Sequence, residues 1–157
     1  MSGGKGRALK LHVGHGKTGS SYLQTCFAQN AERLASHGIT YPFDKFTENA
    51  IAGRISSGNG LGVRRWIDGE ITSPVPLQAS HVLFSREQLT RELATGERLA
   101  RLRERADSEG IDQIDFLLFI RDPAPFLNSA YQQGIKREGH TWDFDDFVKT
   151  YDAPELV

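Results

Sequence analysis

The sequence predicts an α/β fold in which a parallel sheet is flanked by helices, in three layers α/β/α. Segments with the two-residue period of strands alternate along the chain with segments that have helical spacing, which is typical of a parallel sheet. The apolar run FLLFI, at residues 116–120, indicates a central strand that is covered on both faces. The chain has 157 residues, 38% hydrophobic and 25% charged, so we expect one domain over residues 1–157 with its own core.

The N-terminal part of the chain is predicted to form a strand, a turn and a helix. Residues 1–7 are glycine-rich and basic, and we expect them to be a flexible tail. Apolar and polar residues alternate over 9–13 as they do in a strand, and a glycine-rich turn follows. From Ser20 onward apolar residues recur at helical spacing until Gly38, which is placed as a C-terminal cap.

The next part of the chain has weaker patterns. ITYP is predicted to be a short strand that ends at its proline, and residues 43–79 are predicted to be mostly loop. Within that range SSGNGLG is expected to be a flexible loop, and VRRWI one or two helical turns.

The second half of the chain has clearer elements. HVLFS predicts a strand, which a helix follows from about Arg86, and the charged segment 97–109 predicts a solvent-facing helix. IDFLLFI predicts the strand named above. Asp122 then caps a helix with prolines in its first turn, and a last amphipathic helix lies near the C-terminus.

Composition excludes several classes of protein. Nineteen basic and twenty acidic residues give a net charge of -1, so no general attraction to nucleic acid or to anionic membranes is expected. The longest apolar run, 116–120, is too short to span a bilayer, and the basic N-terminus is not followed by the apolar segment of a secretory signal. Cys26 is the single cysteine, so no internal disulfide can form. We therefore expect a cytoplasmic protein.

The turn between the first strand and the first helix, GHGKTGSS at 14–21, has the composition of a phosphate-binding loop. A strand, a glycine turn and a helix N-terminus in this order favour an anion, because unpaired amides and the helix dipole point at the turn. The spacing of Gly14, Gly16 and Gly19 also fits a dinucleotide loop, which needs an acidic residue after the next strand; Asp44 is the nearest. The nucleoside triphosphatase pattern G-x-x-x-x-G-K-[ST] fits in no register.

A third interpretation gives every residue of this turn a role. Its glycines let the backbone curl around an anion, and Lys17 neutralises the charge. The hydroxyls of Thr18, Ser20 and Ser21 add hydrogen-bond donors beside the backbone amides. The turn is therefore predicted to hold a phosphate-like anion.

A second predicted anion site lies far along the chain, where Arg121 leaves the carboxyl end of a strand and Ser129 follows in the next helix. An arginine there projects into the crevice in which parallel sheets bind ligands, and its planar fork suits a phosphate. Together with KTGSS at 17–21, the segment FLLFIRDPAPFLNSAYQQG resembles the sulfotransferases that use 3′-phosphoadenosine 5′-phosphosulfate (PAPS). In that family a K-[ST]-G-[ST]-[ST] loop holds the 5′-phosphosulfate, and an arginine and a serine hold the 3′-phosphate.

The resemblance implies a fold like that of P-loop nucleoside triphosphate hydrolases, with PAPS as co-substrate and no metal. The implied activity is transfer of a sulfuryl group to a hydroxyl or amine of a small-molecule or carbohydrate acceptor. The implied cofactor-binding residues are Gly16, Lys17, Thr18, Gly19, Ser20, Ser21, Arg121 and Ser129. Lys17 would stabilise the departing phosphate, and Glu87 is the expected base, with His15 as the rival candidate. Residues 43–79 are expected to line the acceptor pocket.

Two other functions stay open at this point. One is a small-molecule kinase that uses ATP and magnesium, with Asp122 as the metal-binding residue at a strand end. The other is a nucleotide-binding remnant without catalysis, because the family continues with elements that close over the cofactor, and we expect this chain to lack that C-terminal part. Core packing is the expected role of both Trp66 and Trp142.

Overall fold

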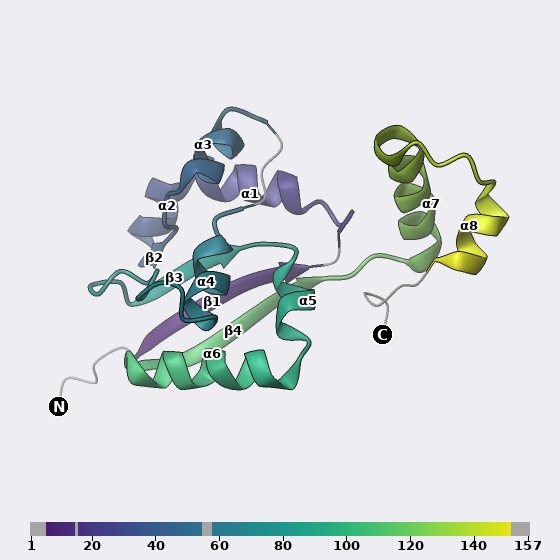
Figure 1. Cartoon of the computed structure of the whole chain (residues 1–157). Coiled ribbons are helices and arrows are strands. Elements are labelled where there is room, and N and C mark those ends of the chain that lie inside the picture. The colour runs from purple at the N-terminus through teal and green to yellow at the C-terminus, as the bar shows by residue number, and fades with distance from the viewer. Residues whose placement is uncertain (1–5, 15, 55–57, 152–157) are drawn as a thin grey trace.

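The centre of the molecule is a four-stranded parallel sheet in the order β2-β3-β1-β4 (Figure 1). The structure is a computed structural model and describes residues 6–14, 16–54 and 58–151. The strands are β1 (Arg7–Gly14), β2 (Ile39–Thr40), β3 (His81–Ser85) and β4 (Ile111–Phe119). Because all four run in the same direction, the carboxyl ends of β1, β3 and β4 meet at one edge, where parallel sheets bind ligands.

Helices lie against both faces of the sheet, and a further group extends past its carboxyl edge (Figure 1). One face carries α1 (Ser20–Gln29), α2 (Ala31–Ser36) and α3 (Lys45–Ile51). The other face carries α4 (Leu61–Ile67), α5 (Leu89–Leu93) and α6 (Gly96–Ser108). The further group consists of α7 (Pro123–Gln133), the π-helix η1 (Gly134–Glu138) and α8 (Phe144–Thr150). The predicted α/β class is confirmed, and none of the described helices is long and apolar enough to cross a bilayer.

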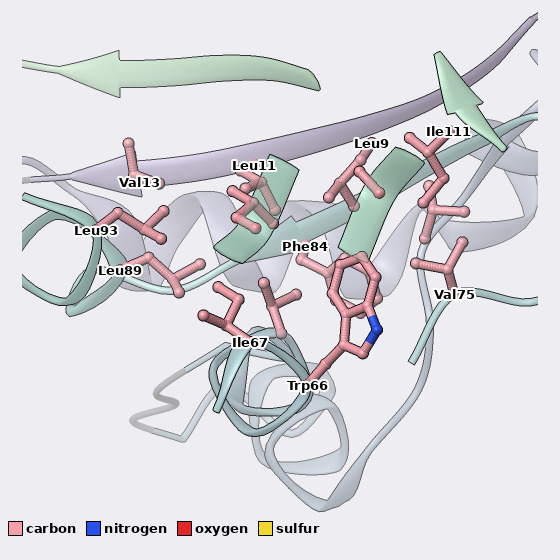
Figure 2. Packing of buried hydrophobic residues seen from close by; sticks show 14 residues of the cluster. Leu9, Leu11, Val13, Trp66, Ile67, Val75, Phe84, Leu89, Leu93 and Ile111 are labelled. Atoms are coloured by element: carbon pink, nitrogen blue, oxygen red, sulfur yellow. The ribbon is translucent and has the colours of Figure 1, made fainter. Parts of the chain in front are cut away.

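The larger core fills the space between the sheet and α4, α5 and α6 (Figure 2). Leu9 and Leu11 of β1 and Phe84 of β3 are almost completely buried there, beside Trp66 of α4. Removing such large side chains from water stabilises the fold by about 1.5–3 kcal/mol each. Leu83 points to the opposite face, as the alternation of a strand requires, and packs in a smaller core with residues of α1 and α3.

Most of the predicted elements are confirmed, and three differences lie in the first third of the chain. Arg7, which was assigned to the tail, begins β1, and its guanidinium donates to the Glu109 carbonyl at 2.6 Å. The first helix is interrupted at Asn30, so that α1 and α2 replace one continuous helix. Helix α3 was missed, although Asp44 begins it with a reciprocal capping box in which its carboxylate accepts from the Thr47 amide at 2.9 Å.

The prediction that the 116–120 run is a central strand covered on both faces is wrong. Strand β4 lies at the edge of the sheet, and Phe116 and Leu118 are each 48% exposed. The other residues of the run are between 38% and 77% exposed. Only the beginning of β4 enters the core, through buried Ile111 and half-buried Ile114. Within the described residues, no strand pairs with the outer side of β4. An apolar run favours a strand, but the order of strands in the sheet decides what covers it.

Candidate functional site

The candidate site begins in the turn that joins β1 to α1, at the carboxyl edge of the sheet. Its backbone enters the left-handed region twice, at Lys17 with φ 67° and at Gly19 with φ 90°. Lys17 is the one non-glycine residue of the described chain with a positive φ, a conformation that costs about 1 kcal/mol or more and is concentrated at functional sites. The glycine adopts the same region freely, and a Cβ there would meet nothing within 4 Å.

The N-terminus of α1 presents hydrogen-bond donors to this turn. The first helical amides have no intrahelical partner, and Gly19 at the N-cap has no side chain with which to satisfy them. Together with the helix dipole, this arrangement favours an anion. The Ser20 hydroxyl lies buried beneath the turn, 3.5 Å from the Thr18 hydroxyl, whereas Ser21 is exposed. The turn can therefore surround an anion with amides and hydroxyls.

Arg121 meets this turn across 104 residues of sequence. Its Nη1 donates to the Lys17 carbonyl at 2.9 Å, so the two predicted anion segments are in contact. The Lys17 ammonium donates to the side-chain oxygen of Gln133 on α7. The turn is thus held by two contacts to Lys17, one from the segment between β4 and α7 and one from α7 itself.

Ser129 lines a polar hollow of about 220 Å³ beside Lys17. Among the described residues, the lining contains amide, hydroxyl and positively charged side chains and no acidic one. The lining residues are Lys17, Ser129, Gln132, Gln133, Lys136 and Arg137. Arg121 contacts the turn without lining this hollow, so the structure brings Arg121 and Ser129 to the same turn but not to one shared cavity.

The expected base, Glu87, lies beside the turn. Its Oε2 is 3.7 Å from the place that a Cβ on Gly16 would occupy. The Arg86 amide donates to the His12 carbonyl at 3.0 Å, which carries the chain after β3 across the end of β1 and toward the turn. The rival base, His15, lies outside the described residues.

A buried polar pair supports the turn from below and was not predicted. His12 of β1 and Ser85 of β3 are both completely buried, and His12 Nδ1 lies 2.7 Å from the Ser85 hydroxyl. The other ring nitrogen has no hydrogen-bond partner among the residues that the structure describes. Burial lowers the pKa of His12 and therefore favours the neutral ring. The alternation of apolar and polar residues along β1 could not predict this pair, because Ser85 lies 73 residues further along the chain.

The segment Gly58–Gly60 closes the end of β3, although SSGNGLG was predicted to be a flexible loop. This prediction is wrong for residues 58–60, which are buried. The Ser85 amide donates to Asn59 Oδ1 at 2.8 Å, and the Gly60 amide donates to the Ser85 carbonyl at 3.2 Å. A Cβ at Gly58 would lie only 1.9 Å from the Ser85 carbonyl oxygen, so this glycine is required for close packing.

A larger cavity, of about 330 Å³, opens on the other side of Lys17. Its walls come from Gly16 and Lys17 and from α7, η1, α8 and the residues between them. None of the described residues in the range 43–79, where the acceptor pocket was expected, lines it. Trp142, expected in the core, is 51% exposed and lines this cavity, whereas Trp66 is in the core as predicted.

Comparison of the chain with models of known protein families, with curated proteins and with solved structures finds no match in any of the three. The function therefore has to be argued from the chemistry of the site.

Proposed function

We propose that this protein is a PAPS-dependent sulfotransferase with a fold like that of P-loop nucleoside triphosphate hydrolases. One observation carries the proposal: the guanidinium of Arg121 donates to the backbone of Lys17 at 2.9 Å, so two segments that the sequence predicts to bind anions are in contact, although they lie far apart in the chain. A co-substrate with phosphate at both its 5′ and 3′ positions needs two neighbouring anion sites. The residues present fit it, because the turn offers amides and hydroxyls and the hollow at Ser129 is lined by cations.

In this proposal the turn at residues 16–21 and the N-terminus of α1 hold the 5′-phosphosulfate. Ser129 holds the 3′-phosphate in the hollow that Lys136 and Arg137 also line. Arg121 lies outside that hollow and exchanges its contact with the Lys17 carbonyl for the same phosphate. PAPS, when bound, supplies an activated sulfuryl group. Lys17 exchanges its contact with Gln133 for the phosphate that departs and stabilises the negative charge that collects there.

The test is a calorimetric titration of the protein with adenosine 3′,5′-bisphosphate and, separately, with ADP and magnesium. We expect the bisphosphate to bind without metal and Arg121→Ala to weaken that binding about 10- to 100-fold, the effect of losing hydrogen bonds to a charged group. Arg101→Ala on α6 is the matched control, because it removes the same charge from an exposed helix away from the turn. Stronger binding of ADP with magnesium would replace the proposal with the kinase alternative.

A second arm measures turnover once the bisphosphate is shown to bind. Lys17→Ala removes a preorganised donor, and we expect turnover with PAPS to fall by on the order of 10²- to 10³-fold while the bisphosphate still binds. Equal losses in bisphosphate affinity and in turnover would mean that Lys17 only binds the co-substrate and does not act on the departing phosphate.

A further inference from the structure

The larger cavity beside Lys17 has the character of a site for a small organic molecule. Its volume, about 330 Å³, suits a compound of one or two rings, and its walls combine aromatic side chains with a few polar groups. The aromatic lining consists of Phe126, His140, Trp142, Phe147 and Tyr151. Gly16 and Lys17 form the wall next to the turn, so a molecule in this cavity lies against the proposed sulfuryl site.

Glu138 and His140 place a carboxylate in this cavity and hold it there. His140 Nε2 lies 3.1 Å from Glu138 Oε2, and the Glu138 side chain remains 59% exposed. Glu138 ends the π-helix η1, a rare element that is frequently found at functional sites. Gly134, at the start of η1, lets the imidazole approach, because a Cβ at this position would lie 2.9 Å from His140 Nδ1.

Trp142 supplies a flat apolar surface to the same cavity. Its ring stacks on the imidazole of His140, with centroids 4.8 Å apart and planes inclined by 30°. The Tyr131 hydroxyl donates to the Trp142 carbonyl at 2.8 Å and ties this segment to α7. A large aromatic side chain that is half exposed at a cavity is suited to bind another ring.

We propose that this cavity binds the sulfuryl acceptor, an uncharged aromatic compound with a hydroxyl group, and that Glu138 is the base that accepts the hydroxyl proton. This inference rests on the proposed sulfotransferase function. Aromatic walls select a ring, and the Glu138 carboxylate disfavours an anionic acceptor. Glu87, the base expected from the sequence, does not line this cavity, whereas Glu138 does.

The transfer balances with the groups at hand. The acceptor oxygen forms a bond to sulfur, and the bond between sulfur and the phosphate oxygen breaks, which leaves the electron pair on the phosphate beside Lys17. The proton of the acceptor hydroxyl passes to the Glu138 carboxylate. His140 is a positioning residue, which holds that carboxylate through its Nε2–H.

Binding is tested first, by titrating 2-naphthol into the protein with and without saturating adenosine 3′,5′-bisphosphate. We expect 2-naphthol to bind and Trp142→Ala to weaken it at least about 10-fold, the loss of one well-packed aromatic contact. Phe43→Ala is the control, because Phe43 is also an exposed aromatic residue, at 60%, but does not line this cavity. Preferential binding of methyl glucoside would overturn the assignment of an aromatic acceptor.

Catalysis is tested next, by chromatographic detection of 2-naphthyl sulfate formed from PAPS. We expect Glu138→Gln to lower kcat about 10²-fold or more with little change in KM, as for loss of a general base. His140→Ala should lower kcat, and His140→Gln, which keeps a side-chain N–H donor, should restore part of it. A larger loss in Glu87→Gln than in Glu138→Gln would overturn the assignment of the base.

The outcomes separate this inference from the proposed function. If the bisphosphate binds but 2-naphthol does not, the acceptor cavity is wrong and the sulfotransferase proposal stands. If Trp142→Ala weakens binding of the bisphosphate and leaves binding of 2-naphthol unchanged, the cavity holds the adenine ring. This result also overturns the inference. If 2-naphthol binds through Trp142 but the bisphosphate does not bind, the sulfotransferase proposal fails, and with it the role of Glu138.

Discussion

Replacing Gly58 with alanine tests whether the close packing of Gly58–Gly60 on the end of β3 holds the site together. Gly58 has a φ of 74°, which alone makes an alanine unfavourable by about 1–2 kcal/mol. The added Cβ would also lie 1.9 Å from the Ser85 carbonyl oxygen, a distance that no packing tolerates. The segment must therefore move away from β3.

The magnitude follows from the hydrogen bonds that this movement breaks. The Gly60 amide would lose the Ser85 carbonyl, and the Ser85 amide would lose Asn59 Oδ1, both in buried surroundings. Each buried group left without a partner costs about 1–3 kcal/mol, so the two together amount to about 2–6 kcal/mol beyond the backbone term, and we expect about 3 kcal/mol.

Gly38→Ala is the matched control for this prediction. Gly38 has almost the same φ, 78°, but a Cβ there would meet nothing within 4 Å. Urea unfolding of both variants should therefore place Gly58→Ala about 3 kcal/mol below Gly38→Ala, which corresponds to a melting temperature about 6–12 °C lower. Equal stability of the two variants, within about 0.5 kcal/mol, would refute the argument that Gly58 is needed for this packing.

Two further predictions concern pH. Burial lowers the pKa of His12 in the folded protein below its ordinary value of 6.5. As the pH falls, the unfolded chain therefore takes up this proton before the folded protein does. The contribution of neutral His12 to the free energy of unfolding is thus present above pH 6.5 and is lost as the pH falls from 6.5 toward the pKa of the folded protein. His12→Gln should reduce this slope in urea unfolding, and an unchanged slope contradicts the prediction. The hydrogen bond from the Lys10 ammonium, 2.6 Å long, lowers the pKa of the Asp115 carboxyl below its ordinary 3.8. The contribution of this pair to the free energy of unfolding is therefore present above pH 3.8 and is lost as the pH falls below it. The stability difference between wild type and Asp115→Asn should shrink as the pH falls through this range, and a constant difference would argue against the pair.

Local patterns predicted the elements that are formed by neighbours in sequence. The glycine turn after β1 and the start of α1 at Ser20 follow from residues within one short stretch. Asp122 was predicted to begin α7, and its carboxylate accepts from the Ala124 amide at 3.0 Å. The Asp44 cap of α3 had a similar local signal, which was overlooked in a segment of weak periodicity.

Contacts between distant residues were not accessible in the same way. The pairing of His12 with Ser85 depends on which strand lies beside β1, and the exposure of Phe116 depends on β4 lying at the edge. An acceptor pocket was expected among residues 43–79, whereas the cavity beside Lys17 that we propose for the acceptor is built largely from the C-terminal helices. The spacing of apolar residues along the chain does not predict where α7, η1 and α8 lie relative to the sheet.

The sequence by itself determined the α/β class, most of the helices and strands, and the glycine turn between β1 and α1, because these depend on backbone conformation and spacing among neighbours. The tertiary structure alone decided that Arg121 contacts Lys17, that β4 is an edge strand, and that Glu138 and Trp142 share a cavity with that lysine. These contacts depend on strand order and on helix placement, which are set by packing between segments far apart in the chain.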